Sequence, residues 1–167
     1  MAEQLRGYEH ALPIALLRAR EATMRKFKPQ VDALGLTMQQ WRVIRALAEN
    51  ESLVANELAE RCVILPSSIT RILSSLIAKG YIRTVADPDG RRKAVSLTPT
   101  GMMIYRQMAM KSEAIYRVLE ERFSRRNMEQ LLKLLAQLRT AADGIDPEAL
   151  PEVDRAFIAR LESMTTE

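Results

Sequence analysis

The sequence has very few of the residues that build disulfides and metal centres. Its 167 residues include one cysteine, Cys62, and one histidine, His10. A single cysteine excludes a disulfide within the chain, and so few soft ligands exclude a zinc site. The sequence also lacks a glycine-rich phosphate loop, and spacing identifies no partner for His10 in general-base chemistry. These absences predict a protein that is not an enzyme and that holds no metal or other cofactor.

Long apolar runs are missing too. No segment reaches the roughly 18 consecutive apolar residues that a membrane-spanning helix requires. Residues 1–10 carry Glu3, Arg6 and Glu9 where a signal peptide would be apolar. Apolar residues make up 47% and charged residues 28% of the chain, which are ordinary proportions for a globular protein. We therefore expect a single domain over residues 1–167 that acts in the cytoplasm and has no membrane partner.

Acidic side chains are scarce in the middle of the chain. Residues 61–93 hold seven basic and two acidic side chains, a local charge of +5, in a chain whose net charge is +4. Residues 140–167 show the reverse, with seven acidic and two basic side chains. The asymmetry suits an anionic partner for the middle segment, nucleic acid first and a membrane surface second, although a solvated basic face without a partner is about as common.

Apolar periodicity and turn residues predict a mainly helical α+β chain. Helices are expected over residues 13–31, 38–49, 52–62, 66–79, 98–123, from 124 or 127 to about 138, and 153–164. Two short strands are expected over residues 81–86 and 94–97, because these residues are β-branched or aromatic and a Pro-Asp-Gly turn region separates them.

The helix predicted over residues 66–79 has two very different faces. Its apolar face places five residues at helical spacing: Ile69, Ile72, Leu73, Leu76 and Ile77. Its other face consists of short hydroxyl side chains around one cation: Ser67, Ser68, Thr70, Arg71, Ser74 and Ser75. A solvent-facing helix normally carries Glu and Lys, which form helices better than serine does. The hydroxyl face therefore suits close approach to a partner.

Two short helices joined by a tight turn and followed by a hairpin indicate a winged helix-turn-helix over residues 37–98, whose second helix enters the major groove of DNA. Hydroxyl groups bond to phosphates and base edges, and Arg71 can bond both acceptors of a guanine. At the hairpin tip, Arg91, Arg92 and Lys93 can reach the adjacent minor groove. Each element alone is ambiguous, but together they predict double-stranded DNA as the partner.

The hairpin carries a further pattern, Asp89-x-Arg91 followed by five residues and Leu97-Thr98, with Gly101 soon after. In this pattern, and in the order of its elements from about residue 12 to residue 138, the chain resembles the multiple-antibiotic-resistance regulator (MarR) family of transcription factors. The resemblance implies that Arg91 enters the minor groove and that Asp89 holds its guanidinium. In the plainer interpretation, Asp89 is only a turn former.

The same resemblance implies a homodimer on a pseudo-palindromic operator. Residues 10–34 and 99–164 would form the helical dimerisation part. The implied contacts of the recognition helix are Ser67, Ser68, Thr70, Arg71 and Ser74. Within the family, residues 16–24, 39–42 and 62–66 are similar to regulators of homoprotocatechuate (aromatic acid) catabolic operons, which implies a repressor released by a small phenolic acid. The similarity departs at Pro66-Ser67, where the related pattern has a cation ahead of the helix.

The first two helices offer a possible receptor for such an acid. Arg20 lies one turn before Met24, and Trp41 and Arg45 are four residues apart, so a cation and an aromatic ring can border one crevice. In the plainer interpretation, which we favour slightly, Arg20 pairs with an acid such as Glu21 and Trp41 packs in the core.

Three other functions stay open at the level of sequence. The first is an effector-independent architectural DNA-binding protein, and the second is a helical interaction module with no nucleic-acid role. The third is a regulator that responds to oxidation of Cys62, for which the chain offers no second cysteine to resolve a sulfenic acid. A buried structural thiol is the favoured interpretation of Cys62.

Overall fold

The computed structural model describes residues 7–86, 93–152 and 154–165. The expectations for Asp89, Arg91 and Arg92 therefore lie outside the described residues. The chain divides into two compact units, Met1–Val118 and Leu119–Glu167, and each is considered by itself below.

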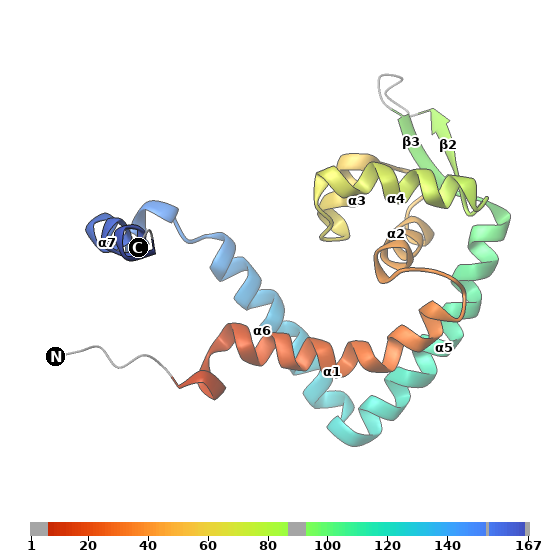
Figure 1. Ribbon diagram of the computed structural model, residues 1–167. Coiled ribbons are helices and arrows are strands. Elements are labelled where there is room, and N and C mark those ends of the chain that lie inside the picture. Colours follow the sequence, from red (N-terminus) through yellow and green to blue (C-terminus); the bar gives the residue numbers. More distant parts are fainter. Residues whose placement is uncertain (1–6, 87–92, 153, 166–167) are drawn as a thin grey trace. The chain divides into compact units, whose positions relative to one another are not determined.

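The order of elements confirms a mainly helical chain with one small sheet (Figure 1). The first unit contains η1 (Tyr8–His10), α1 (Leu12–Asp32), α2 (Met38–Ala48), β1 (Leu53–Val54), α3 (Ala55–Arg61), α4 (Pro66–Ala78), β2 (Ile82–Ala86), β3 (Lys93–Leu97) and most of α5 (Pro99–Phe123). The second unit contains the end of α5, α6 (Arg125–Asp143), η2 (Pro147–Ala149) and α7 (Arg155–Thr165).

Local sequence explains where the helices of the DNA-binding part begin and end. Thr37 caps α2: its Oγ1 accepts from Gln40 N at 3.1 Å, and Gln40 Oε1 accepts from Thr37 N at 3.0 Å. Pro66 is the first residue of α4, where its missing N–H costs no hydrogen bond. Gly80 follows α4 with a φ of 71°, a left-handed conformation that glycine adopts without strain.

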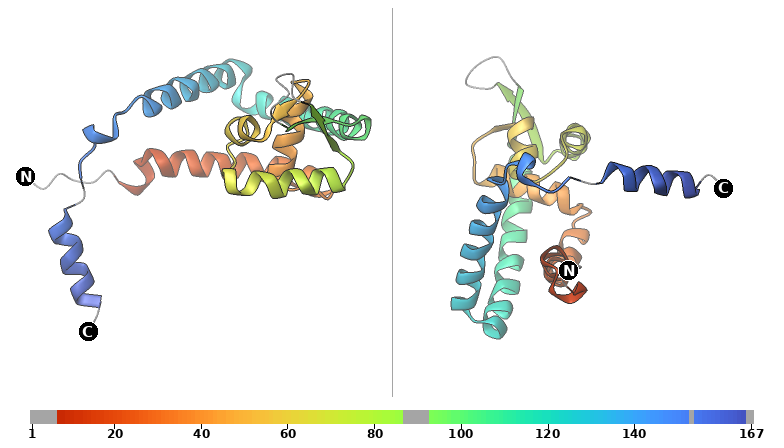
Figure 2. Two further views of the ribbon diagram at one scale, coloured as in Figure 1. Left: turned by 90° about the horizontal axis from the view of Figure 1, so that it is seen from above. Right: turned by 90° about the vertical axis from the view of Figure 1, so that its left-hand side faces the viewer.

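The sheet has three antiparallel strands in the order β1-β3-β2. Val95 of β3 pairs with Leu53 on one side and with Thr84 on the other. The prediction of a helix starting at residue 52 was wrong in its first residues, because 53 and 54 form β1. Two residues are too few to show an alternating pattern, so pairing with β3, about 40 positions away in sequence, determines their conformation. Figure 2 shows the β2–β3 hairpin extending from the helices of the first unit.

The core of the first unit is assembled from the end of α1, from α2, α3 and α4, from the sheet and from α5. Its largest fully buried side chains include Ile44, Leu58, Leu76, Ile82 and Met108. These residues come from five different elements, so the winged part and the start of α5 pack as one body.

A tight corner joins the hairpin to α5. Thr98 Oγ1 donates to the Gly80 carbonyl at 2.6 Å and accepts from Gly101 N at 3.1 Å. A Cβ on Gly101 would lie 2.0 Å from the Tyr81 carbonyl oxygen, so only glycine fits there. This close approach is a physical reason for the glycine that follows the hairpin pattern.

The second unit hides little of its apolar surface. Ser124 caps α6 as expected, with its Oγ accepting from Asn127 N at 3.2 Å. The leucines of α6 are largely exposed within one chain, with Leu132 at 59%. Among the described residues, no single helix is long and apolar enough to cross a membrane. One bent pair of helices, α3 with α4, meets that test of length and composition together, with a bend of 109°.

Candidate nucleic-acid interface

The two faces of α4 are separated as the sequence predicts. Ile69, Ile72, Leu73 and Leu76 are buried in the core of the first unit. The hydroxyl face points outward: Ser67, Thr70, Arg71 and Ser74 are exposed and Ser68 is half-buried. No acidic residue lies within α4, so this exposed face carries only hydrogen-bonding groups and one positive charge.

Ser75 has a different role from the other hydroxyls. Gln40 Nε2 donates to Ser75 Oγ at 3.0 Å, which ties α4 to the start of α2. The half-buried Ser75 is therefore a packing contact rather than part of the exposed face. Helical periodicity places Ser75 on the edge of that face. Its role differs from that of Ser74 only because α2 packs beside Ser75.

The turn between α3 and α4 is short and conformationally strained. Val63 has a φ of 50°, a left-handed conformation that is costly for a β-branched residue. Ile64 N closes the turn by donating to the Ala59 carbonyl at 2.8 Å. Arg42 Nη1 donates to the Val63 carbonyl at 3.3 Å, so α2 supports the turn that leads into α4.

The described part of the wing presents basic side chains on its strands. Lys93 is exposed at the start of β3. Arg83 of β2 is also exposed, and its Nε donates to Ser96 Oγ on β3 at 3.3 Å. From the sequence, Arg83 was included only in the charge of residues 61–93. The alternation of side chains along a strand could have identified Arg83 as an outward-facing cation of the wing. The roles assigned to Asp89, Arg91 and Arg92 stay predictions.

The residues proposed for the acid-binding crevice have separate partners in the structure. Arg20 forms an ion pair with Glu21. Trp41 is 7% exposed and stacks on Tyr105 with ring centroids 6.1 Å apart. These contacts agree with the plainer interpretation.

The other two residues of the predicted crevice lie on the same helices. Met24 of α1 is half-buried. Arg45 of α2 is exposed and faces Glu49, with Nε and Oε1 3.8 Å apart. The crevice itself stays a prediction.

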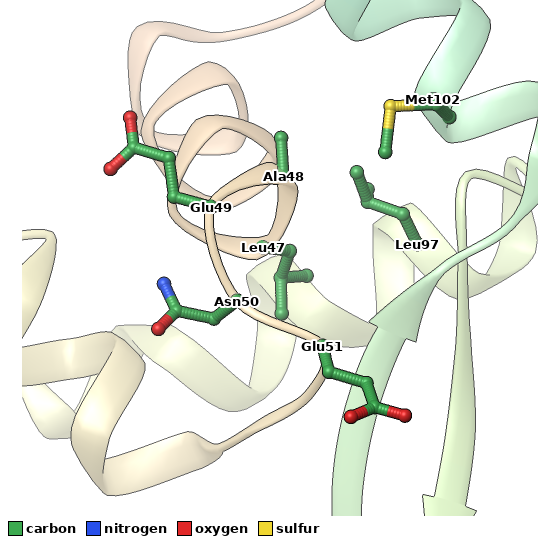
Figure 3. A pocket seen from close by; sticks show the side chains of 7 residues that line it. All are labelled: Leu47, Ala48, Glu49, Asn50, Glu51, Leu97 and Met102. Carbon is green, nitrogen blue, oxygen red and sulfur yellow. The ribbon is translucent and has the colours of Figure 1, made fainter.

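A pocket of about 310 Å³ lies between the end of α2 and the corner where β3 meets α5 (Figure 3). The apolar side chains of Ala48, Leu97 and Met102 face one another there, while Glu49 and Glu51 point in different directions. Because the two carboxylates do not converge, this pocket offers no cation site.

Cys62 ends α3 and is 4% exposed. Burial raises the pKa of its thiol, although the nearby Arg42 and Arg61 guanidinium groups act in the opposite direction. The thiolate is the reactive form, so the raised pKa favours a structural thiol over a redox sensor. Among the described residues, no three His, Cys, Asp or Glu side chains gather in a way that could hold a metal ion.

Comparison with known proteins identifies the family. The model of the MarR family matches residues 34–93, which span α2 to the hairpin. The homoprotocatechuate degradative operon repressor of Escherichia coli is 40% identical over 128 residues, 76% of this chain and 86% of that protein.

Solved structures agree with that assignment. The crystal structure of the transcriptional regulator PA4135 has a TM-score of 0.73 at 38% identity, covering 82% of this chain and 98% of its own. The structure of NadR in complex with 4-hydroxyphenylacetate has a TM-score of 0.73 at 34% identity, covering 81% of this chain and 100% of its own. The chain therefore belongs to the MarR family and is a transcriptional regulator, not an enzyme.

Proposed function

We propose that this protein is a homodimeric repressor of an aromatic-acid catabolic operon and that a small phenolic acid releases it from DNA. Two relatives support the choice of ligand class. One is named for repression of a homoprotocatechuate degradative operon, and the other, NadR, was solved with 4-hydroxyphenylacetate. Both are at least 34% identical to this chain. A repressor of this kind acts in the cytoplasm, where its operator is.

The exposed hydroxyl face of α4 is the observation that carries the DNA-binding proposal. Its apolar side is fixed in the core, so Ser67, Thr70, Arg71 and Ser74 are presented at a constant orientation. Ser68 lies at the edge of the same face. In a winged helix-turn-helix this face lies in the major groove, where Arg71 reads guanine and the hydroxyls bond to phosphates.

The wing completes the proposed contact. Lys93 and the tip residues Arg91 and Arg92 supply cations for the minor groove and its phosphates, with Asp89 holding Arg91. Phosphate contacts fix the position of a protein on the duplex, whereas base contacts give sequence preference. We therefore assign affinity mainly to the wing and sequence preference mainly to Arg71.

A second copy is proposed to cover apolar side chains that one chain leaves open. Leu12, Leu16 and Leu17 of α1 are 39–52% exposed. Such exposure over adjacent turns is typical of an interaction surface. A two-fold dimer would place its recognition helices on half-sites about 34 Å apart.

The phenolic acid is proposed to bind among α1, α2 and α5 of the first unit, with Arg20, Met24, Trp41 and Arg45 as candidate contacts. Aromatic rings already gather where these helices meet: Phe27 and Tyr116 are 5.3 Å apart, and Trp41 stacks on Tyr105. Release requires that the acid distinguish the DNA-bound and free dimers by a few kcal/mol, because equal affinity shifts no equilibrium.

The direct test measures binding of the protein to its own promoter DNA. Fluorescence anisotropy of the labelled DNA reports the binding, with and without phenolic acids. We expect nanomolar affinity for one site and its loss with 4-hydroxyphenylacetate or a related acid. Binding that ignores every such acid would refute release while leaving DNA recognition intact. Equal affinity for unrelated sequences with a steep salt dependence would instead indicate an architectural protein.

A further inference from the structure

A pocket of about 290 Å³ lies between α2 and the end of α3. Its lining is Arg42, Arg45, Ala46, Glu49, Asn50, Arg61 and Cys62. The lining includes three arginines and one glutamate, so the arginine pocket, as we call it, has an excess of positive charge. Arg42 and Arg45 come from α2 and Arg61 from the last turn of α3, which the fold brings together.

Most hydrogen-bond donors of two of these arginines are unused. Arg42 makes one long hydrogen bond, from Nη1 to the Val63 carbonyl at 3.3 Å. For Arg61, the described residues provide no hydrogen bond or ion pair. Since each guanidinium carries five N–H donors, the two arginines keep most of their capacity for a ligand.

The remaining charges of the pocket largely compensate each other. Arg45 and Glu49 approach to 3.8 Å and form an i,i+4 pair. Asn50 Nδ2 donates to the Ala46 carbonyl at 2.7 Å, so this amide is held by the end of α2. The uncompensated charge therefore belongs to Arg42 and Arg61.

Cys62, which also lines the pocket, lies close enough to both cations for their charge to act on its thiol. Arg42 and Arg61 both lower the pKa of the Cys62 thiol, against the larger effect of burial, which raises it. An electrostatic effect on one buried group requires that both guanidinium groups lie near it. The thiol therefore reports on charge in the pocket.

We propose that the arginine pocket binds a small oxyanion, a carboxylate or a phosphate, between Arg42 and Arg61. Both classes of anion present paired oxygens that match a planar guanidinium. The bound anion would join α2 to the end of α3 and so stabilise the turn at Val63 that leads into α4. Because α4 is the proposed DNA-contacting helix, a more stable turn should also raise DNA affinity, and only this effect on DNA affinity rests on the proposed function.

The first test measures binding without DNA, by calorimetry and thermal unfolding of the full chain. Inorganic phosphate and succinate are titrated separately at constant ionic strength, so that the two sources of oxyanion are distinguished. We expect one anion per chain and a rise in Tm of about 3–6 °C at a tenfold excess over Kd. Arg61→Gln should abolish the binding, whereas Arg106→Gln, which alters an exposed arginine of α5, should bind like the parent.

The second test uses the single cysteine. A bound anion neutralises the cations beside Cys62, so alkylation by neutral iodoacetamide at constant pH should slow by about threefold or more when the anion saturates the site. The Arg61→Gln variant should show no such protection. This readout is independent of DNA and of phenolic acids, so it stands even if operator binding or release fails.

The proposal is wrong if the parent protein binds neither anion, or if Arg61→Gln binds as the parent does. If neither anion binds, the same variant also shows what Arg61 does instead: a loss of DNA affinity in Arg61→Gln, with a salt slope lower by about one, would make Arg61 a contact to a DNA phosphate. Arg61→Gln could lower Tm even without an anion. Each variant is therefore compared with itself, with and without phosphate or succinate, so that only the shift caused by the anion is scored.

Discussion

The two units of the chain contain equally clear amphipathic helices but bury them very differently. In the first unit, Ile44, Leu58 and Leu76 have no exposed surface. In the second, Leu131, Leu132 and Leu135 of α6 are 37–59% exposed within one chain. An apolar stripe therefore predicts that a helix face needs a partner, but it does not say whether that partner lies in the same chain.

The difference matters because exposed leucines are costly. Removing a leucine side chain from water contributes about 1.5–3 kcal/mol, so several open leucines on one helix forgo a large stabilisation. A second copy of the chain can supply the missing contacts, since its α6 carries the same stripe. On this argument, the winged part (residues 37–98) should be stable on its own contacts, whereas the stability of the second unit should depend on protein concentration.

The largest expected effect tests the first half of this comparison. Leu76→Ala removes a fully buried side chain from α4 and should lower the free energy of unfolding by about 2–5 kcal/mol. Urea unfolding at two protein concentrations measures it. The loss should be the same at both concentrations, because Leu76 packs within its own chain. A loss below about 1 kcal/mol would show that the core is less tightly packed than the structure indicates.

A charge on α6 tests the second half. Leu132→Glu places a carboxylate on the exposed stripe and should weaken self-association by about 2 kcal/mol per dimer, or roughly thirtyfold in the dissociation constant. Sedimentation of dilute samples measures the dissociation constant. Gln137→Glu, at another exposed position of α6, is the matched control and should have little effect. If both variants associate like the parent, the α6 stripe is not the subunit interface.

Substitutions on α4 separate recognition from folding inside the first unit. Arg71→Ala should weaken binding to the operator by about 1–3 kcal/mol, because it removes the only cation on the exposed face, and leave Tm nearly unchanged. Ser75→Ala should do the opposite, since it removes the hydrogen bond to Gln40 that holds α4 against α2. Anisotropy and thermal unfolding of both variants would distinguish them. Two variants with the same profile would contradict the division of the hydroxyls.

The sequence predicts those parts of the molecule that local patterns determine. The two faces of α4 follow from helical spacing, and strands β2 and β3 follow from their β-branched residues and the turn region between them. Strand β1 does not, because two residues become a strand only by pairing with β3.

Contacts between distant residues were equally out of reach of local patterns. Ser75 differs from Ser74 only through Gln40, 35 positions away. Arg42 and Arg61 line one pocket only because the fold brings the end of α3 beside α2. For the same reason the sequence left two interpretations of Arg20 and Trp41 open, and the contacts to Glu21 and Tyr105 support the plainer one.

The smallest expected effect concerns the one strained position of the turn before α4. Val63 is 81% exposed and adopts a φ of 50°, so its side chain gains little burial to offset the left-handed backbone. Asparagine tolerates this conformation far better, and Val63→Asn should raise the free energy of unfolding by about 0.5–1 kcal/mol. Val63→Ala keeps the unfavourable Cβ and should gain much less. Thermal unfolding of both variants measures the difference, and equal stabilities would mean that the turn carries no backbone strain. Because Arg42 contacts the backbone carbonyl of Val63 rather than its side chain, neither variant should disturb the support that α2 gives the turn.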